Sequence, residues 1–187
     1  MNRTELINYI IKKQGYETYL EIGLGTGKNF AAITVKAKYS VDPSGLADFR
    51  MESDEFFKFY DKKWDIIFID GLHHADQVRR DIINSWNCLN DGGCLVIHDT
   101  NPDREEITHV PRDSKEWTGD VYKAIHQIDG PPKFTLKDDH GVTVIRKTGD
   151  LVMSDGIIEW DGFVMFREVI LNLVTAEEAI KIVDGWI

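Results

Sequence analysis

The sequence predicts a doubly wound α/β fold, in which helices cover both faces of a mostly parallel sheet. The first observation is an apolar run at residues 19–22, which leads into a glycine-rich turn and a helical pattern over residues 28–37. The second is the alternation of strand-like and helix-like segments that follows. The third is a pair of short apolar runs, at residues 133–136 and 142–145, whose short link is typical of a hairpin.

Length and charge narrow the class of protein. A chain of 187 residues, with 42% hydrophobic and 29% charged residues, is expected to be soluble and globular. Its net charge of −10 argues against a nucleic-acid partner and favours a small-molecule substrate. No apolar run approaches the ~20 residues that span a membrane, and residues 1–5 lack a signal-peptide pattern. We interpret Cys88 and Cys94 as free thiols of a cytoplasmic protein without a membrane contact.

An amphipathic helix is predicted at the N-terminus. Asn2 and Glu5 have the spacing of a capping box, and Gly15 can end the helix. We assign residues 1–148, including this helix, to one domain. Residues 149–187 are expected to form a C-terminal appendage, which packs on the same domain or forms the interface of a homo-oligomer.

The glycine-rich turn reads Glu-x-Gly-x-Gly-x-Gly, with Glu21, Gly23, Gly25 and Gly27 in the fixed positions. Glycine allows a tight turn and lets a ligand approach the bare backbone, beside the free N–H groups of the following helix. A dinucleotide-binding turn requires a glycine where this chain has Lys28.

This pattern resembles motif I of the class I S-adenosylmethionine (SAM) methyltransferases. The resemblance implies a Rossmann-like, seven-stranded sheet with a terminal antiparallel hairpin, and SAM as the cofactor. It also implies that Glu21 and the three glycines help to bind that cofactor.

Asp42 ends the predicted second strand, nineteen residues after Gly23. An acid at this place can accept hydrogen bonds from both hydroxyls of a ribose. The alternative is that residues 42–45 form an ordinary turn. After a weak third strand, the resemblance places the adenine ring near Met51, Ser53 and Asp54, although Ser53 and Asp54 also suit the start of a helix.

Polar residues end two further predicted strands. Asp70 follows residues 64–69, and His98 and Asp99 follow residues 94–97. Asp70 is also expected to contact the cofactor. Because the carboxyl ends of neighbouring parallel strands meet at one edge, these side chains are expected to converge beside the glycine turn. Their repulsion would be relieved by a proton or a cation. The long polar segment 100–119 has the length of an active-site lid.

Residues 68–74, 92–100 and 117–121 resemble a group of small stand-alone class I methyltransferases that accompany sugar- and polysaccharide-modifying enzymes. The resemblance covers roughly residues 16–148 and is expected to extend into the C-terminal tail. More distantly, the chain is similar to the metal-dependent O-methyltransferases of the catechol and macrocin types.

The distant resemblance implies that Asp70, His98 and Asp99 hold a divalent metal. A histidine among the ligands suits Mn²⁺, Fe²⁺ or Zn²⁺ better than Mg²⁺, so the metal stays open. His73 occupies the place of the base in the catechol-type enzymes. We therefore expect direct methyl transfer from SAM to a small-molecule or glycoside hydroxyl, with His73 or Asp70 removing its proton.

Three other functions remain open. An NAD-dependent oxidoreductase would explain the glycine turn and Asp42, but Lys28 and the terminal hairpin argue against it. A SAM-binding partner without catalysis would need no base. A metal-dependent hydrolase would be built on Asp70, His73, His98 and Asp99.

Overall fold

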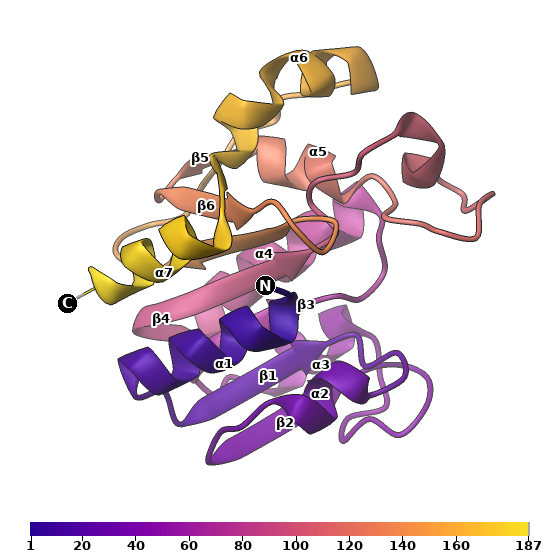
Figure 1. The fold of residues 1–187 in the computed structure, drawn as a ribbon. Helices are drawn as coiled ribbons and strands as arrows, with labels where there is room; N and C mark the ends of the chain where they lie inside the picture. The colour runs from indigo at the N-terminus through magenta and orange to yellow at the C-terminus, as the bar shows by residue number, and fades with distance from the viewer. Residues whose placement is uncertain (187) are drawn as a thin grey trace.

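A seven-stranded sheet with helices on both faces forms the centre of the computed structural model, which describes residues 1–186 (Figure 1). In spatial order the strands are β2 (Ala37–Val41), β1 (Thr18–Ile22), β3 (Trp64–Ile69), β4 (Leu89–His98), β7 (Val142–Arg146), β6 (Lys133–Leu136) and β9 (Leu173–Val174). β7 pairs antiparallel with β4 and β6, whereas the other neighbours pair in parallel. The predicted fold class, with its antiparallel hairpin, is confirmed.

The helices alternate with the strands as far as α5. They are α1 (Arg3–Gln14), α2 (Lys28–Ala32), α3 (Ser53–Phe59), α4 (Ala75–Cys88), α5 (Val121–His126), α6 (Trp160–Leu171) and α7 (Ala176–Asp184), with a 3-10 turn, η1 (Glu105–Thr108). Two short strands, β5 (Ile128–Gly130) and β8 (Val152–Met153), form a separate antiparallel pair. Within residues 1–186, no helix is both long and apolar enough to span a membrane.

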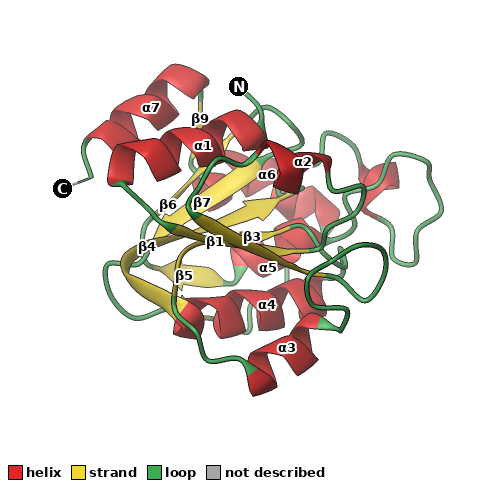
Figure 2. Cartoon of the chain, turned by 90° about the horizontal axis from the view of Figure 1, so that it is seen from below, coloured by secondary structure: helices red, strands yellow, loops and turns green. Residues whose placement is uncertain are grey.

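The two faces of the sheet carry separate apolar clusters. α1, α2 and α7 lie on one face, and α3, α4 and α5 on the other (Figure 2). Leu6 of α1 and Val183 of α7 pack with Phe68 on the first face. Ile82 of α4 and Phe163 of α6 belong to the second cluster. The sheet is thus doubly wound, and its carboxyl edge is left for a ligand.

The N-terminal helix has the predicted ends. Asn2 and Glu5 form the capping box, and Gly15 adopts a left-handed conformation, with φ of 68°, at the C-cap. α2 is shorter than predicted, because the β-branched residues that follow it, from Ile33 onward, continue as extended chain rather than helix.

The predicted third strand, residues 49–51, is reduced to one bridge between Phe49 and Val41. The Phe49 ring packs instead against Phe56 and Tyr60, with centroids 5.0 and 4.7 Å away. The aromatic contacts of the Phe49 ring thus take the place of the strand pairing expected for residues 49–51. The seventh strand is β9, which pairs in parallel with β6 at the opposite edge. The sheet therefore has the predicted number of strands, but the C-terminal segment supplies the last one.

Candidate functional site

A cleft of about 620 Å³ lies at the carboxyl edge of the sheet. It joins the glycine turn, the ends of β2, β3 and β4, the start of α3, and the segment that contains Trp117. The sequence-predicted site residues that line it are Gly23, Gly25, Asp42, Ser53, Asp70, His73, His98 and Asp99.

The glycine turn has a backbone that other residues rarely adopt. Gly23, Gly25 and Gly27 have φ values of 89°, 51° and 74°. A Cβ on Gly23 would lie 2.1 Å from the carbonyl oxygen of Asp70, whereas a Cβ on Gly25 would meet nothing within 4 Å. Gly23 therefore lets the turn touch the loop after β3, and Gly25 leaves open space in front of the turn.

Asp42 braces this turn. Its Oδ2 accepts hydrogen bonds from the backbone N–H of Leu24, at 2.8 Å, and of Gly25, at 3.3 Å. Its Oδ1 accepts from the N–H and hydroxyl of Ser44, both at 2.8 Å. Burial raises the pKa of Asp42, but these hydrogen bonds outweigh it and lower that pKa below its usual value. Asp42 is thus an ionised hydrogen-bond acceptor at the cleft. Its hydrogen bonds with Ser44 also form the turn at residues 42–45 that the sequence allowed as the alternative.

Glu21 does not line the cleft. Its carboxyl group is buried and accepts hydrogen bonds from the Asn29 side-chain amide, at 2.9 Å, and from the Tyr19 hydroxyl. Burial raises the pKa of Glu21 to about 7. Glu21 therefore links β1 to α2 beneath the turn.

The three residues predicted near adenine are placed differently from one another. Ser53 lines the cleft, but it is not the N-cap of α3, a position that Glu52 holds. Asp54 forms an ion pair with Arg80 at 3.0 Å and does not line the cleft. Met51 packs against the apolar cluster beneath α3 and α4.

Sequence reasoning missed Asp81 of α4. This carboxyl group is 1% exposed and lines the cleft, where its Oδ1 accepts from the Ser53 hydroxyl at 2.6 Å and from Gln77 at 3.1 Å. Burial raises the pKa of Asp81 to about 6. The available signal was its place beside Val78 and Ile82 on the buried side of the helix, where a carboxylate is costly unless it has a role.

Asp70, His73 and Asp99 converge. His73 Nε2 lies 3.4 Å from Asp70 Oδ1, and His73 Nδ1 lies 3.2 Å from Asp99 Oδ2. The buried Nδ1 has no partner with hydrogen-bond geometry. Asp99 has a left-handed φ of 59°, a strained conformation of the kind found at functional sites.

The charges of this group support one another. Burial lowers the pKa of His73, but the carboxylates of Asp70 and Asp99 outweigh it and raise that pKa. Burial raises the pKa of Asp70, but hydrogen bonds from His73 and His98 lower it well below its usual value. Asp70 is therefore ionised at neutral pH.

His98 uses both ring nitrogens. Its Nδ1 is 3.1 Å from Asp70 Oδ1 and 3.3 Å from Asp99 Oδ1, and its Nε2 is 2.8 Å from Arg3 Nη1. Burial lowers the pKa of His98, but the carboxylates of Asp139, Asp70 and Asp99 outweigh it and raise that pKa. Because arginine only donates, the contact with Arg3 nevertheless requires an unprotonated Nε2, so the Nδ1 proton faces the Asp70 and Asp99 carboxylates.

Within residues 1–186, the side chains of Asp70, His73 and Asp99 each offer one possible ligand atom, and these three atoms lie within 4.8 Å of one another, close enough to share a metal ion. The sequence-based set had His98 in place of His73. Two carboxylates and an imidazole fit a divalent cation such as Mn²⁺, Fe²⁺ or Zn²⁺, and the unpartnered Nδ1 of His73 is consistent with such a ligand.

Trp117 covers His73 from the predicted lid. The two rings stack with centroids 5.1 Å apart and planes inclined by 14°. The indole N–H donates to the carbonyl of His109 at 2.7 Å, which fixes the ring from behind. Arg112 lies over the indole, 5.6 Å from its centroid.

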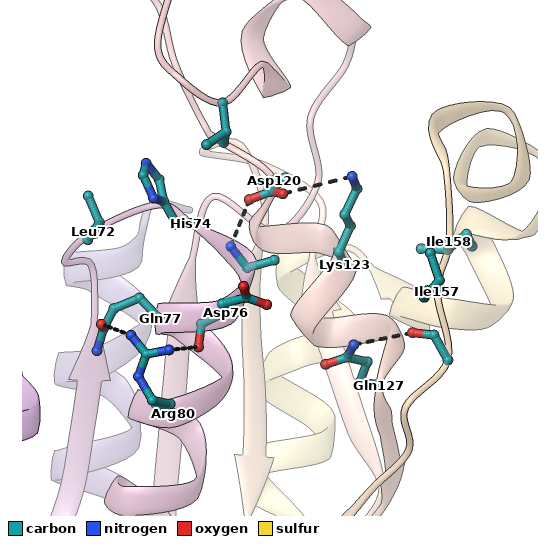
Figure 3. A pocket seen from close by; sticks show the side chains of 13 residues that line it. Leu72, His74, Asp76, Gln77, Arg80, Asp120, Lys123, Gln127, Ile157 and Ile158 are labelled. Carbon is teal, nitrogen blue, oxygen red and sulfur yellow. Dashed lines mark hydrogen bonds and ion pairs between the residues drawn. The ribbon is translucent and has the colours of Figure 1, made fainter.

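A second cavity, of about 490 Å³, adjoins this cleft and shares Leu72 and Gln77 with it. Figure 3 shows it between α4, α5 and the segment that carries Ile157. Gln127 donates to the carbonyl of Gly156 at 3.2 Å, so α5 holds that segment as one wall.

Residues 33–100 match a family model described as a methyltransferase domain. No curated protein sequence matches the chain. Among solved structures, a candidate O-methyltransferase from Klebsiella pneumoniae aligns with a TM-score of 0.57 and 12% identity, over 79% of this chain and 80% of that one. A protein from Corynebacterium glutamicum aligns with a TM-score of 0.55 and 16% identity, over the same shares.

An O-methyltransferase from Bacillus cereus, solved with S-adenosylhomocysteine, aligns with a TM-score of 0.51 and 11% identity, over 81% of this chain and 82% of that one. These alignments show the fold, which is that of the class I methyltransferases. The matched domain model spans β2 to β4 of this fold and agrees with it.

Proposed function

We propose that the protein transfers the methyl group of SAM to a hydroxyl of a small molecule, with glycosides as the first class to test. The observation that carries the proposal is that one cleft joins the glycine turn and Asp42 to the group formed by Asp70, His73 and Asp99. The first half suits a nucleoside cofactor, and the second half can deprotonate a hydroxyl.

The turn has the features that SAM binding requires. Gly25 leaves space at the backbone, and Asp42 presents an ionised carboxylate for ribose hydroxyls. The buried carboxyl of Asp81, with Ser53, offers polar atoms for the base. SAM supplies an activated methyl group, so the protein's own residues need to align the acceptor and remove its proton.

His73 suits the role of base. An imidazole nitrogen takes the hydroxyl proton as the oxygen–carbon bond forms and the sulfur–carbon bond breaks. Asp70 and Asp99 stabilise the resulting imidazolium, and Trp117 holds the ring plane. A metal bound through His73 would use the same lone pair, so its roles as base and as ligand exclude each other.

The second cavity is proposed to hold the rest of the acceptor. Leu72 and Ile157 supply apolar surface, and His74 and Asp76 supply polar groups beside it (Figure 3). Two further charged residues in its lining compensate each other, since Lys123 lies 3.8 Å from Asp120. This combination suits an uncharged, hydroxylated molecule with an apolar face.

Calorimetry with S-adenosylhomocysteine and with NAD tests the cofactor, and only the former is expected to bind. A screen of glycosides and diols for methyl transfer, with and without chelator, tests the acceptor and the metal. Loss of activity with chelator, restored by Mn²⁺, would assign His73 as a ligand. Activity that survives chelation would assign it as the base. Absence of S-adenosylhomocysteine binding at millimolar concentration would overturn the proposal.

A further inference from the structure

Arg3, the first residue of α1, reaches the cleft and was not predicted from the sequence. Its backbone N–H and its Nη1 each donate to Asp139, on Oδ2 and Oδ1, at 2.9 Å. Nη1 also donates to His98 Nε2 at 2.8 Å. Asp139, with a left-handed φ of 56°, lies in the turn between β6 and β7. The Arg3 guanidinium is therefore anchored through Nη1, which contacts both Asp139 and His98.

The other edge of the guanidinium donates no hydrogen bond to any of the described residues. Nε lies 4.0 Å from Asp70 Oδ2, beyond hydrogen-bond distance, and Nη2 has no partner within residues 1–186. The Arg3 side chain is 30% exposed and lines the cleft. The Nε–Nη2 edge is the one that can bind a carboxylate with two parallel hydrogen bonds.

Asp70 divides its oxygens in a matching way. Oδ1 faces His73 and His98, whereas Oδ2 faces Arg3. Arg3 and Asp70 thus form a partly exposed ion pair at 4.0 Å, and its two opposite charges are complementary to those of a zwitterion.

Arg112 does not offer an equivalent group. Among the described residues that line the cleft, Arg3 and Arg112 are the arginines, and no lysine lines it. Arg112 donates through Nε to the carbonyl of Ser114 at 2.8 Å and through Nη2 to the carbonyl of Lys115, so its own loop occupies its binding edge.

We propose that Arg3 and Asp70 bind the amino-acid end of the cofactor, with Arg3 holding the carboxylate and Asp70 the ammonium group. This inference rests on the proposed function. Thr4 places Arg3 beside the glycine turn, since its hydroxyl donates to Asn29 of α2 at 2.7 Å. The N-terminal helix thus acts as a specificity element that distinguishes an amino-acid-bearing nucleoside from a plain one.

The test is a calorimetric cycle with the full chain, without an acceptor. The ligands are S-adenosylhomocysteine, its decarboxylated derivative, and 5′-methylthioadenosine, which lacks the amino-acid end. Wild type is expected to bind S-adenosylhomocysteine on the order of tenfold to a hundredfold more tightly than the decarboxylated derivative. Arg3→Met should bind both about equally and keep the wild-type affinity for 5′-methylthioadenosine.

Lys28→Met is the matched control, because it removes an exposed positive charge beside the same turn but outside the cleft lining. It should leave the ratio of affinities unchanged. If Arg3→Met lowers affinity for all three ligands alike, or if wild type does not distinguish the first two, the inference is wrong. If Arg3→Met fails to fold, the wild-type comparison still tests whether the cleft recognises the carboxylate, and equal wild-type affinities would overturn the inference. Failure of wild type to bind any of them would instead overturn the proposed function.

Discussion

Trp117 and His73 stack almost in parallel, at 5.1 Å between ring centroids, although they come from segments on opposite sides of α4 in the sequence. The contact fixes the plane of the imidazole that faces Asp70 and Asp99. It also brings the segment 100–119 onto the site.

Replacing Trp117 is expected to lower the turnover rate. Trp117→Ala frees the His73 ring, and misplacement of a reacting group by about 1 Å costs up to ~100-fold in rate. We expect a fall in kcat of roughly tenfold to a hundredfold, measured by methyl transfer to an accepted hydroxyl. Trp117→Phe retains a stacking ring and should keep most of the activity. An alanine variant with wild-type kcat would show that the stack has no role in catalysis.

His73 and the adjacent His74 form a matched pair. His73→Gln removes the proposed base and should lower kcat by roughly 10²- to 10⁴-fold. His74 contacts Trp117 edge-on at 6.1 Å, outside the carboxylate group, and lines the proposed acceptor cavity. His74→Gln should therefore act mainly on KM and change kcat by less than about tenfold. Calorimetry with S-adenosylhomocysteine should give wild-type affinity for both variants. Equal losses of kcat in the two variants would contradict the assignment of His73.

Gly25→Ala should destabilise the protein less than Gly23→Ala. A Cβ on Gly23 would lie 2.1 Å from the Asp70 carbonyl, so Gly23→Ala must displace the loop after β3. Gly25 has open space and only the strain of its φ of 51°, which costs about 1–2 kcal/mol. Urea denaturation should show a loss of more than about 3 kcal/mol for Gly23→Ala. Similar losses in both variants would show that the turn can rearrange.

Glu21 should make the protein less stable as the pH rises. Folding raises its pKa from 4.5 to about 7, so the folded state binds more protons than the unfolded state between these values. Its contribution is therefore largest below pH 4.5 and is lost as the pH rises through 7. Between about pH 5 and pH 8, Glu21→Gln should gain on the order of 2–3 kcal/mol relative to wild type.

The measurement for Glu21 is urea denaturation at both pH values. Glu55→Gln is the control, because Glu55 is exposed on α3 and its variant should follow the wild-type pH dependence. Other titrating groups are shared by all three proteins and cancel in the comparison. A Glu21→Gln variant that parallels wild type would show that the carboxyl is already ionised in the folded state.

The order of strands and helices was predictable because the apolar periodicities are strong, and Asn2 and Gly15 mark the ends of α1. The third strand was not, since Phe49 pairs with aromatic rings that local propensity does not describe. β9 was missed because two residues carry no strand pattern, and only the edge of β6 makes them a strand.

The site residues that directly follow a strand were predictable from the sequence, as for Asp42, Asp70 and Asp99. It was not predictable where a side chain arrives from elsewhere. Arg3 enters from the N-terminal helix, and Asp81 enters from the middle of α4. Only the packing of those helices brings their charged groups to the cleft.

The two terminal helices of the sheet's first face are joined across the length of the chain. Tyr9 donates to Asp184 at 2.6 Å, and Lys13 pairs with the same carboxylate at 2.7 Å. During translation α1 leaves the ribosome long before α7, so part of its apolar side stays uncovered until α7 has been made. The helix that carries Arg3 thus acquires its full set of contacts only after α7 has been made, and ligand binding at its first turn would report that α1 and α7 have docked.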